Sequence, residues 1–293
     1  MARVGFIFAG QGAQYAGMGK ELATKSPDAR RIFAEADRLL GYSISQLCFE
    51  GTLEDLTPCA VCQPAIFTVS MAAHAAYLAE GGTAPAGCGG LSLGEFSAAC
   101  AAGVFSFETA LQLVALRGRL MDDCCQKHPG GMAAIIGGKA EEIQAVCTEC
   151  GIDVANYNCP GQIVISGAHE ALDRAVELLT PKCLRAVKLT VAGAYHSRLM
   201  NEAAERFGEA LMTAEINAPS VPFAQNVPGA LVTSPEAIRD NLRRQVSSSV
   251  RWEECARALM PLCDSFAEFG PGNVLSGFMK RIDRKFPAAP AIG

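Results

Sequence analysis

The 293-residue chain is poor in positive charge, in histidine and in tryptophan. It has 25 Lys and Arg against 30 Asp and Glu, a net charge of −5, four His and one Trp. Nucleic-acid binding needs a basic surface that pairs with phosphates, so this balance argues against nucleic acid as a partner. We find no run of about 18 uncharged apolar residues, so we expect no membrane span.

The sequence also lacks the features of a secretory leader. The first residues, MARVGFIFAGQG, carry one Arg and a short apolar stretch, whereas a signal peptide needs a longer apolar region and a small-residue cleavage site. We therefore interpret VGFIF as a buried first strand and expect a cytoplasmic protein. The 13 cysteines are an odd number in apolar and helical contexts, which is typical of reduced thiols used as small hydrophobes.

Two CxxC pairs, Cys59/Cys62 and Cys147/Cys150, are the only pattern that suggests a metal. Two such pairs can form a zinc site. However, the second pair lies in a helix-like run and the first leads directly into Gln63 and a proline. We therefore predict no metal site.

What the chain does have is alternation of strand-like and helix-like segments. VGFIF is followed by the loop AGQG, residues 65–80 have helical spacing, and GCGGLSLGEFSAACAAGVF fits a short buried strand, a turn and a helix. SFETALQLVALRGRLMDDCC is an amphipathic helix with Ser106 as its N-cap. This alternation predicts an α/β fold with a mainly parallel sheet.

Residues 127–195 follow a different pattern. Strand-like and helix-like runs occur there in the order β-α-β-β-α-β, with a turn at residues 159–161 and Gly151 as the end of the first helix. This order is the ferredoxin-like pattern. We predict a small domain of residues 127–195 inserted into a larger domain formed by residues 1–126 and 196–293.

The stretch GLSLG places Ser92 between Gly90 and Gly94, which fits the motif G-x-S-x-G. In this motif a serine nucleophile stands on a strained strand-to-helix turn, so small residues are needed on both sides. The following helix N-terminus favours a developing negative charge. The motif alone leaves an ordinary tight turn as an equal alternative.

A serine nucleophile needs a base, and His196 is the best candidate by elimination. His74 lies in an apolar helix-like run, His128 lies in a loop, and His169 begins a helix. His196 stands between a strand end and a helix start, where α/β folds assemble their sites. A hydrogen-bonded structural histidine is the alternative.

Arg117 lies in the apolar face of the helix predicted from residue 107 to 125. That face contains Ala110, Leu113, Val114, Leu120 and Met121, and the opposite face contains Glu108, Gln112, Arg119, Asp122 and Asp123. A buried guanidinium needs an anionic partner. Either an internal Asp or Glu or a carboxylate on the substrate would serve, and the pattern does not choose between them.

The loop at residues 9–14, AGQGAQ, follows the first strand. As a dinucleotide loop it lacks the third glycine, because Tyr15 stands in that place. A backbone N–H in this loop suits an oxyanion donor equally well.

Nine segments that include these motifs are spread along the chain. They occur in the order FAGQGAQYAGMG, CQPAIF, GLSLGEFSAA, LRGRLM, GMAAIIG, NYNCPGQIVISG, GAYHSRLM, RRQVSSSVRW and FGPGNVLSGFMKRI. Together they resemble the malonyl-CoA:acyl carrier protein transacylases, the acyltransferases of fatty-acid and polyketide synthesis, over nearly the whole chain. The resemblance implies an α/β-hydrolase-like large domain, and an enzyme that moves malonyl from malonyl-CoA to the phosphopantetheine thiol of acyl carrier protein. It also implies no cofactor and a monomer.

The resemblance assigns catalytic roles to residues of this sequence. Ser92 would carry the acyl group, and His196 would be the general base and then the acid for the leaving thiol. The backbone carbonyl of Gln245 would orient His196. The backbone N–H groups of Gln11 and Leu93 would form the oxyanion hole.

Two substrate contacts and three departures complete the comparison. Arg117 would pair with the free malonyl carboxylate, and Gln63 would contact the substrate. Leu91 stands where the family usually has His, which leaves the Ser–His scheme intact. Tyr195 before the histidine favours malonyl, and a serine in RRQVSSSVRW replaces a proline, where we expect a local loop change.

Two other functions are possible, a serine thioesterase that edits stalled acyl carrier proteins and a catalytically silent docking subunit. Arg117 argues against a hydrolase of neutral acyl chains, and the Ser, His and Arg set argues against a silent subunit. Acyl carrier proteins are acidic, so docking needs a basic patch. Two candidates remain open, one formed by Lys280, Arg281, Arg284 and Lys285 and the other by Lys182, Arg185 and Lys188.

Overall fold

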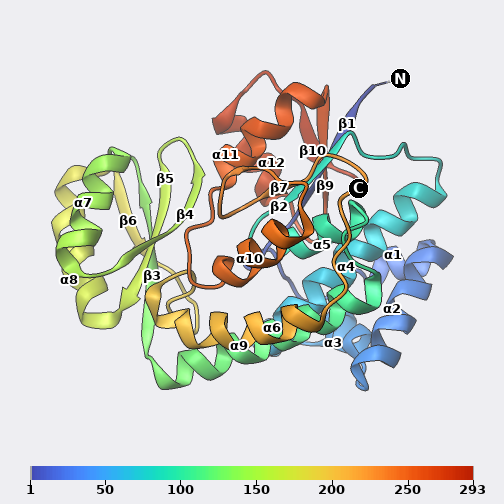
Figure 1. Ribbon diagram of the computed structural model, residues 1–293, viewed down its shortest axis with the longest axis horizontal. Coiled ribbons are helices and arrows are strands. Elements are labelled where there is room, and N and C mark those ends of the chain that lie inside the picture. Colours follow the sequence, from blue (N-terminus) through green and yellow to red (C-terminus); the bar gives the residue numbers. More distant parts are fainter. Residues whose placement is uncertain (1, 293) are drawn as a thin grey trace.

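The computed structural model describes residues 2–292 and shows two four-stranded sheets side by side, each with its own helices (Figure 1). The first sheet is parallel throughout and has the strand order β10-β9-β1-β2. Its strands are β1 (Val4–Phe8), β2 (Gly87–Gly90), β9 (Ser265–Phe269) and β10 (Ala288–Pro290). The predicted mixed α/β fold with a parallel sheet is confirmed.

The alternation of β1 side chains explains why helices cover both faces of this sheet. Phe6 and Phe8 point into the larger core and Ile7 points into a second core. The larger core is built with α2 (Pro27–Leu40), α4 (Cys59–Ala79), α5 (Gly94–Ala101) and α6 (Phe107–Lys127). The second core is built with α11 (Trp252–Leu259) and α12 (Val274–Ile282).

The helix boundaries follow local capping chemistry. Ser106 accepts a hydrogen bond from Thr109 N at 3.0 Å and caps α6 as predicted, and Ser26 and Ser234 cap α2 and α10 in the same way. The remaining elements of the large part are α1 (Lys20–Lys25), α3 (Ile44–Glu50), α9 (Asn201–Thr213), α10 (Pro235–Gln245), β7 (Ala224–Gln225) and β8 (Ala230–Leu231).

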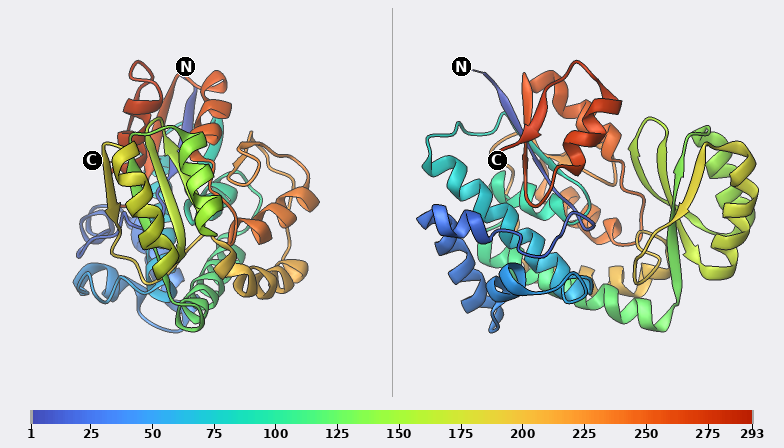
Figure 2. Two further views of the ribbon diagram at one scale, coloured as in Figure 1. Left: turned by 90° about the vertical axis from the view of Figure 1, so that its left-hand side faces the viewer. Right: turned by 180° about the vertical axis from the view of Figure 1, so that it is seen from behind.

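The second sheet is antiparallel and lies at one end of the molecule (Figure 1). Its elements are β3 (Gly130–Ile136), α7 (Ala140–Cys150), β4 (Asp153–Cys159), β5 (Gln162–Ala168), α8 (His169–Leu179) and β6 (Arg185–Lys188). The strand order is β4-β5-β3-β6, and α7 and α8 cover its outer face (Figure 2). The element order β-α-β-β-α-β and the helix end at Gly151, which has a φ of 70°, agree with the sequence prediction.

Strand β4 joins the two parts of the molecule. Tyr157 N donates to Val250 O at 2.9 Å, and Val250 N donates to Ala155 O at 2.8 Å. The segment just after α10 therefore runs along the edge of the second sheet, and β6 forms the opposite, distant edge.

Helix α4 corrects two expectations. It begins at Cys59 instead of residue 65, because Asp122 of α6 accepts the backbone N–H groups of Cys59 and Ala60 at 3.0 and 2.8 Å. Asp122, which the helical periodicity places on the face opposite the apolar one, therefore caps α4. Pro64 is tolerated inside the helix one turn after this start.

The same helix corrects the expectation about long apolar runs. Its 21 residues contain no Asp, Glu, Lys or Arg, and by length and composition alone they could span a bilayer. However, 78% of its most apolar window is buried inside the protein. Its neighbours are α2 and α6, so it is a central core helix.

Candidate active site

Ser92 stands on a strained turn at the carboxyl end of β2. Its φ is 51°, a left-handed conformation that non-glycine residues seldom adopt. A Cβ at Gly90 would collide with Gly94 O, and a Cβ at Gly94 would collide with Phe8 O of the neighbouring strand. Strain of this kind is maintained at functional sites, so the structure favours the nucleophile over an ordinary turn.

His196 meets Ser92 from the segment that leaves the second sheet. Its Nε2 lies 2.7 Å from Ser92 Oγ, and its Nδ1 donates to Gln245 O at 2.8 Å. Because the carbonyl only accepts, Nε2 is the nitrogen that is left to accept the serine proton. Burial, and then the charge of Arg117, lower the pKa of His196 to about 4, so the ring is a neutral base at neutral pH.

Arg117 is 1% exposed and reaches the same serine. Its Nη1 donates to Gln63 Oε1 at 2.7 Å, and its Nη2 donates to Ser92 Oγ at 3.1 Å and to Gln245 Oε1 at 3.0 Å. These acceptors are all neutral oxygens. The sequence left two anionic partners open for Arg117, and within residues 2–292 no Asp or Glu is hydrogen-bonded to it directly. Arg119 is exposed, as expected.

The loops that follow β1 and β2 carry the two predicted oxyanion donors, Gln11 N and Leu93 N. Leu91 N donates to Phe8 O at 3.1 Å, so the loops with Gln11 and Leu93 start side by side. Within the described residues, neither Gln11 N nor Leu93 N has a hydrogen-bond acceptor. Such unused N–H groups at the carboxyl edge of a parallel sheet can stabilise an oxyanion.

Sequence reasoning missed Asn226 and Glu95. Asn226 Oδ1 accepts from Ser92 N at 2.7 Å, and its Nδ2 donates to Gly90 O at 2.8 Å, so it holds both sides of the turn. Glu95 is fully buried and accepts from Asn226 N at 2.8 Å. Glu95 directly follows the GLSLG motif and could have been noticed as a charge in an apolar run. No local pattern marks Asn226.

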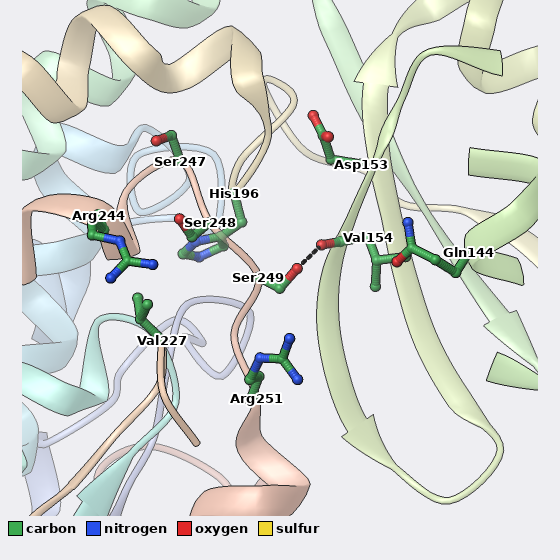
Figure 3. A pocket seen from close by; sticks show the side chains of 10 residues that line it. All are labelled: Gln144, Asp153, Val154, His196, Val227, Arg244, Ser247, Ser248, Ser249 and Arg251. Carbon is green, nitrogen blue, oxygen red and sulfur yellow. Dashed lines mark hydrogen bonds between the residues drawn. The ribbon is translucent and has the colours of Figure 1, made fainter. Parts of the chain in front are cut away.

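A polar cleft of about 300 Å³ lies between the second sheet and the segment after α10, and His196 is part of its lining (Figure 3). Residues of α7 and β4 form one wall, and the segment after α10 forms the other. The lining consists of Gln144, Asp153, Val154, His196, Val227, Arg244, Ser247, Ser248, Ser249 and Arg251. The cleft therefore reaches the histidine that contacts Ser92.

The remaining candidates lie outside the site. His74 packs against Phe6, Phe8 and Phe269, which confirms a packed histidine, and burial lowers its pKa to about 4. The two CxxC pairs lie in α4 and α7, which pack against different sheets, and all 13 cysteines are free. In residues 2–292, no three His, Cys, Asp or Glu side chains gather as metal ligands do.

Comparison with known proteins identifies the family to which the chain belongs. The family model described as acyl transferase domain matches residues 5–281. The chain belongs to this acyltransferase family. The malonyl CoA-acyl carrier protein transacylase of Bacillus subtilis (strain 168) is 42% identical over 292 residues, covering 97% of this chain and 92% of the relative.

Further acyltransferases extend the similarity to polyketide systems. The polyketide biosynthesis malonyl CoA-acyl carrier protein transacylase of B. subtilis is 37% identical, covering 97% of this chain and 99% of its own. A malonyl-transacylase solved in complex with its type II polyketide synthase acyl-carrier protein superposes with a TM-score of 0.95. It is 37% identical and covers 99% of this chain and 96% of its own.

Proposed function

We propose that this acyltransferase moves malonyl from malonyl-CoA to the phosphopantetheine thiol of holo acyl carrier protein through a malonyl-serine intermediate. It would thus be an acyl carrier protein S-malonyltransferase. The observation that carries the proposal is the double contact at Ser92 Oγ, with His196 Nε2 at 2.7 Å and Arg117 Nη2 at 3.1 Å. A base and a carboxylate-binding cation therefore meet at one nucleophile, and the names of the relatives agree with this chemistry.

The proposed reaction has two matching halves. Ser92 Oγ attacks the thioester carbonyl while His196 Nε2 takes the hydroxyl proton, and the N–H groups of Gln11 and Leu93 stabilise the tetrahedral oxyanion. Collapse expels the thiol of coenzyme A, which receives the proton from His196. The carrier-protein thiol then attacks the ester by the reverse steps. The Gln245 carbonyl holds the imidazole in one orientation throughout.

Arg117 supplies the selectivity in this scheme. A malonyl carboxylate can replace neutral oxygens on the guanidinium, and Gln63 holds the other side of the fork. An acetyl group offers no carboxylate, so it gains none of this binding. The alternative, a serine thioesterase that edits stalled carrier proteins, is disfavoured because such an enzyme has no use for a buried cation beside its nucleophile.

The wider organisation is proposed on the same basis. We assign residues 127–195 to an inserted ferredoxin-like subdomain, and residues 1–126 with 196–293 to an α/β-hydrolase-like domain. The strand order β4-β5-β3-β6 and the parallel first sheet support these names. The absence of a cofactor, the monomeric state and the cytoplasmic location remain predictions.

The test is acyl-enzyme formation in the absence of carrier protein. The protein is incubated with malonyl-CoA and its intact mass is recorded beside that of Ser92→Ala. A malonyl adduct on the wild type that the variant lacks is the expected result. Steady release of free malonate would instead favour the thioesterase. The absence of both adduct and turnover would contradict both functions.

A further inference from the structure

Glu95 is a fully buried carboxylate that the proposed reaction does not use. Every hydrogen-bond partner it has is a donor. Gln225 Nε2 donates to Oε1 at 2.9 Å, and Asn226 N and Gln245 Nε2 donate to Oε2 at 2.8 and 3.0 Å. An ionised carboxylate accepts only, so this arrangement fits the charged form of Glu95.

The Gln245 side chain links this carboxylate to Arg117. Its Oε1 accepts from Arg117 Nη2 at 3.0 Å, while its Nε2 donates to Glu95. The amide thus lies between cation and anion with its dipole aligned along the pair. A buried cation without a counter-charge is strongly unfavourable, and the direct acceptors of Arg117 are neutral. Glu95 is the carboxylate that this amide links to the guanidinium.

The charged and titratable groups that face Glu95 are few. They are Arg117 from α6 and Cys255 from α11. The other neighbours are neutral amides from α10 and from the end of β7. Burial dominates and raises the pKa of Glu95 to about 7, so the carboxylate is poised to change its charge near neutral pH.

We propose that Glu95 is the internal counter-ion of Arg117 in the acyl-free enzyme and takes up one proton when a carboxylate-bearing acyl group binds the guanidinium. This inference rests on the proposed function, because it takes malonyl-Ser92 as the loaded state. Loading leaves one buried cation with two carboxylates, and like charges at one site favour protonation of one of them. The malonyl carboxylate contacts the guanidinium directly, whereas Glu95 acts through an amide, so Glu95 is the group that becomes neutral.

Protonation of Glu95 on malonyl loading can be measured as a net uptake of protons. Exchange of a thioester and an alcohol for an ester and a thiol neither releases nor consumes a proton. The solvent supplies the proton that converts the Glu95 carboxylate into the carboxylic acid. Acetyl loading brings no second carboxylate and should leave Glu95 ionised.

The experiment records proton uptake with a pH indicator in weakly buffered solution while the wild-type enzyme is loaded with malonyl-CoA or acetyl-CoA. Adduct is counted by intact mass. At pH 8 we expect uptake of about one proton for each malonyl adduct and nearly none for each acetyl adduct. Malonyl uptake should decline as the pH falls below about 7, because Glu95 is then already protonated in the free enzyme.

Two variants locate the proton. Glu95→Gln keeps the side-chain size without a titrating group, and it should form the malonyl adduct without uptake. Glu268→Gln is the matched control, because Glu268 is 2% exposed and accepts only the backbone N–H groups of Leu275 and Ser276, at 2.9 and 2.7 Å. Uptake should persist in this control.

Two results would overturn the inference while leaving the proposed function intact. One is a malonyl adduct on the wild type with no uptake, and the other is unchanged uptake in Glu95→Gln, which would assign the proton to another group. If Glu95→Gln does not fold, the wild-type comparison of donors across the pH series decides. Failure of the wild type to form any malonyl adduct would overturn both proposals.

Discussion

At the residue scale, the site is organised around one oxygen atom. Ser92 Oγ is shared by the imidazole of His196 and the guanidinium of Arg117, and each of these is in turn held by a different part of Gln245. The backbone carbonyl of Gln245 fixes the base and its side-chain amide fixes the cation. In the proposed function, a single residue would thus couple the chemistry of acyl transfer to the choice of acyl group.

Removal of Arg117 should affect the use of malonyl-CoA and of acetyl-CoA differently. In Arg117→Ala we expect kcat/KM for malonyl-CoA to fall by about 100-fold or more, since truncation of a buried, hydrogen-bonded charge costs about 2–5 kcal/mol. Acetyl-CoA should be used as well as before or better. Arg119→Ala, an exposed arginine on the same helix, is the control and should change neither value. Equal losses for both donors would contradict the assigned role.

At the scale of elements, the sheet edge makes the site possible. Parallel pairing of β1 with β2 brings two loops to one edge, and Asn226 after β7 holds the second loop in its strained form. The turn works only because two glycines let backbones approach closely. A Cβ on Gly94, at the start of α5, would overlap the carbonyl oxygens of Phe8 and Ala9.

The glycine requirement predicts opposite effects for two alanine substitutions in helices. Gly94→Ala should lower the free energy of unfolding by about 3 kcal/mol or more, because its Cβ would overlap Phe8 O and Ala9 O. Gly277→Ala in α12 should raise it by about 0.5–1 kcal/mol, since a Cβ there meets nothing within 4 Å. Urea unfolding of both variants checks this, and a similar loss in both would show that the close approach is not the cause.

At the scale of the whole molecule, we expect the carrier protein to arrive on the side where the cleft between the second sheet and the segment after α10 opens. The cleft is bordered by β4, and the basic cluster of residues 280–285 lies beside the β4–β5 turn, where Arg281 donates to Gly161 O. The other cluster, residues 182–188, lies at the β6 edge, which is the far side of the second sheet. Geometry therefore favours the first cluster for docking.

Charge reversal should distinguish the two clusters. Lys280→Glu with Arg281→Glu should raise KM for acyl carrier protein about tenfold at low salt, and the effect should shrink as salt screens the charges. Lys182→Glu with Arg185→Glu is the matched control and should leave KM unchanged. Malonyl-CoA loading should be normal in both. The reverse pattern would place the docking site on the β6 edge.

Local patterns in the sequence predicted much of this protein. The strand VGFIF, the turn at Ser92, the inward face that carries Arg117, the β-α-β-β-α-β order and the elimination of His74 all depend on residues close in the chain. Side-chain periodicity, capping and glycine chemistry act over a few residues, so a sequence reveals them directly. The capping role of Asp122 could not be predicted in this way, because its partner Cys59 in α4 lies 63 residues away.

The sequence by itself determined the alternation of strands and helices, the nucleophile motif and the inward face that carries Arg117. Only the tertiary structure decided what surrounds them. Glu95, Asn226 and the Gln245 side chain come from α5, from the end of β7 and from α10, and Glu95 and Gln245 are 150 residues apart. A buried charge must find its partners somewhere in the fold, but the chain carries no local mark of which residues those are, because burial and hydrogen bonding are settled only when distant segments pack.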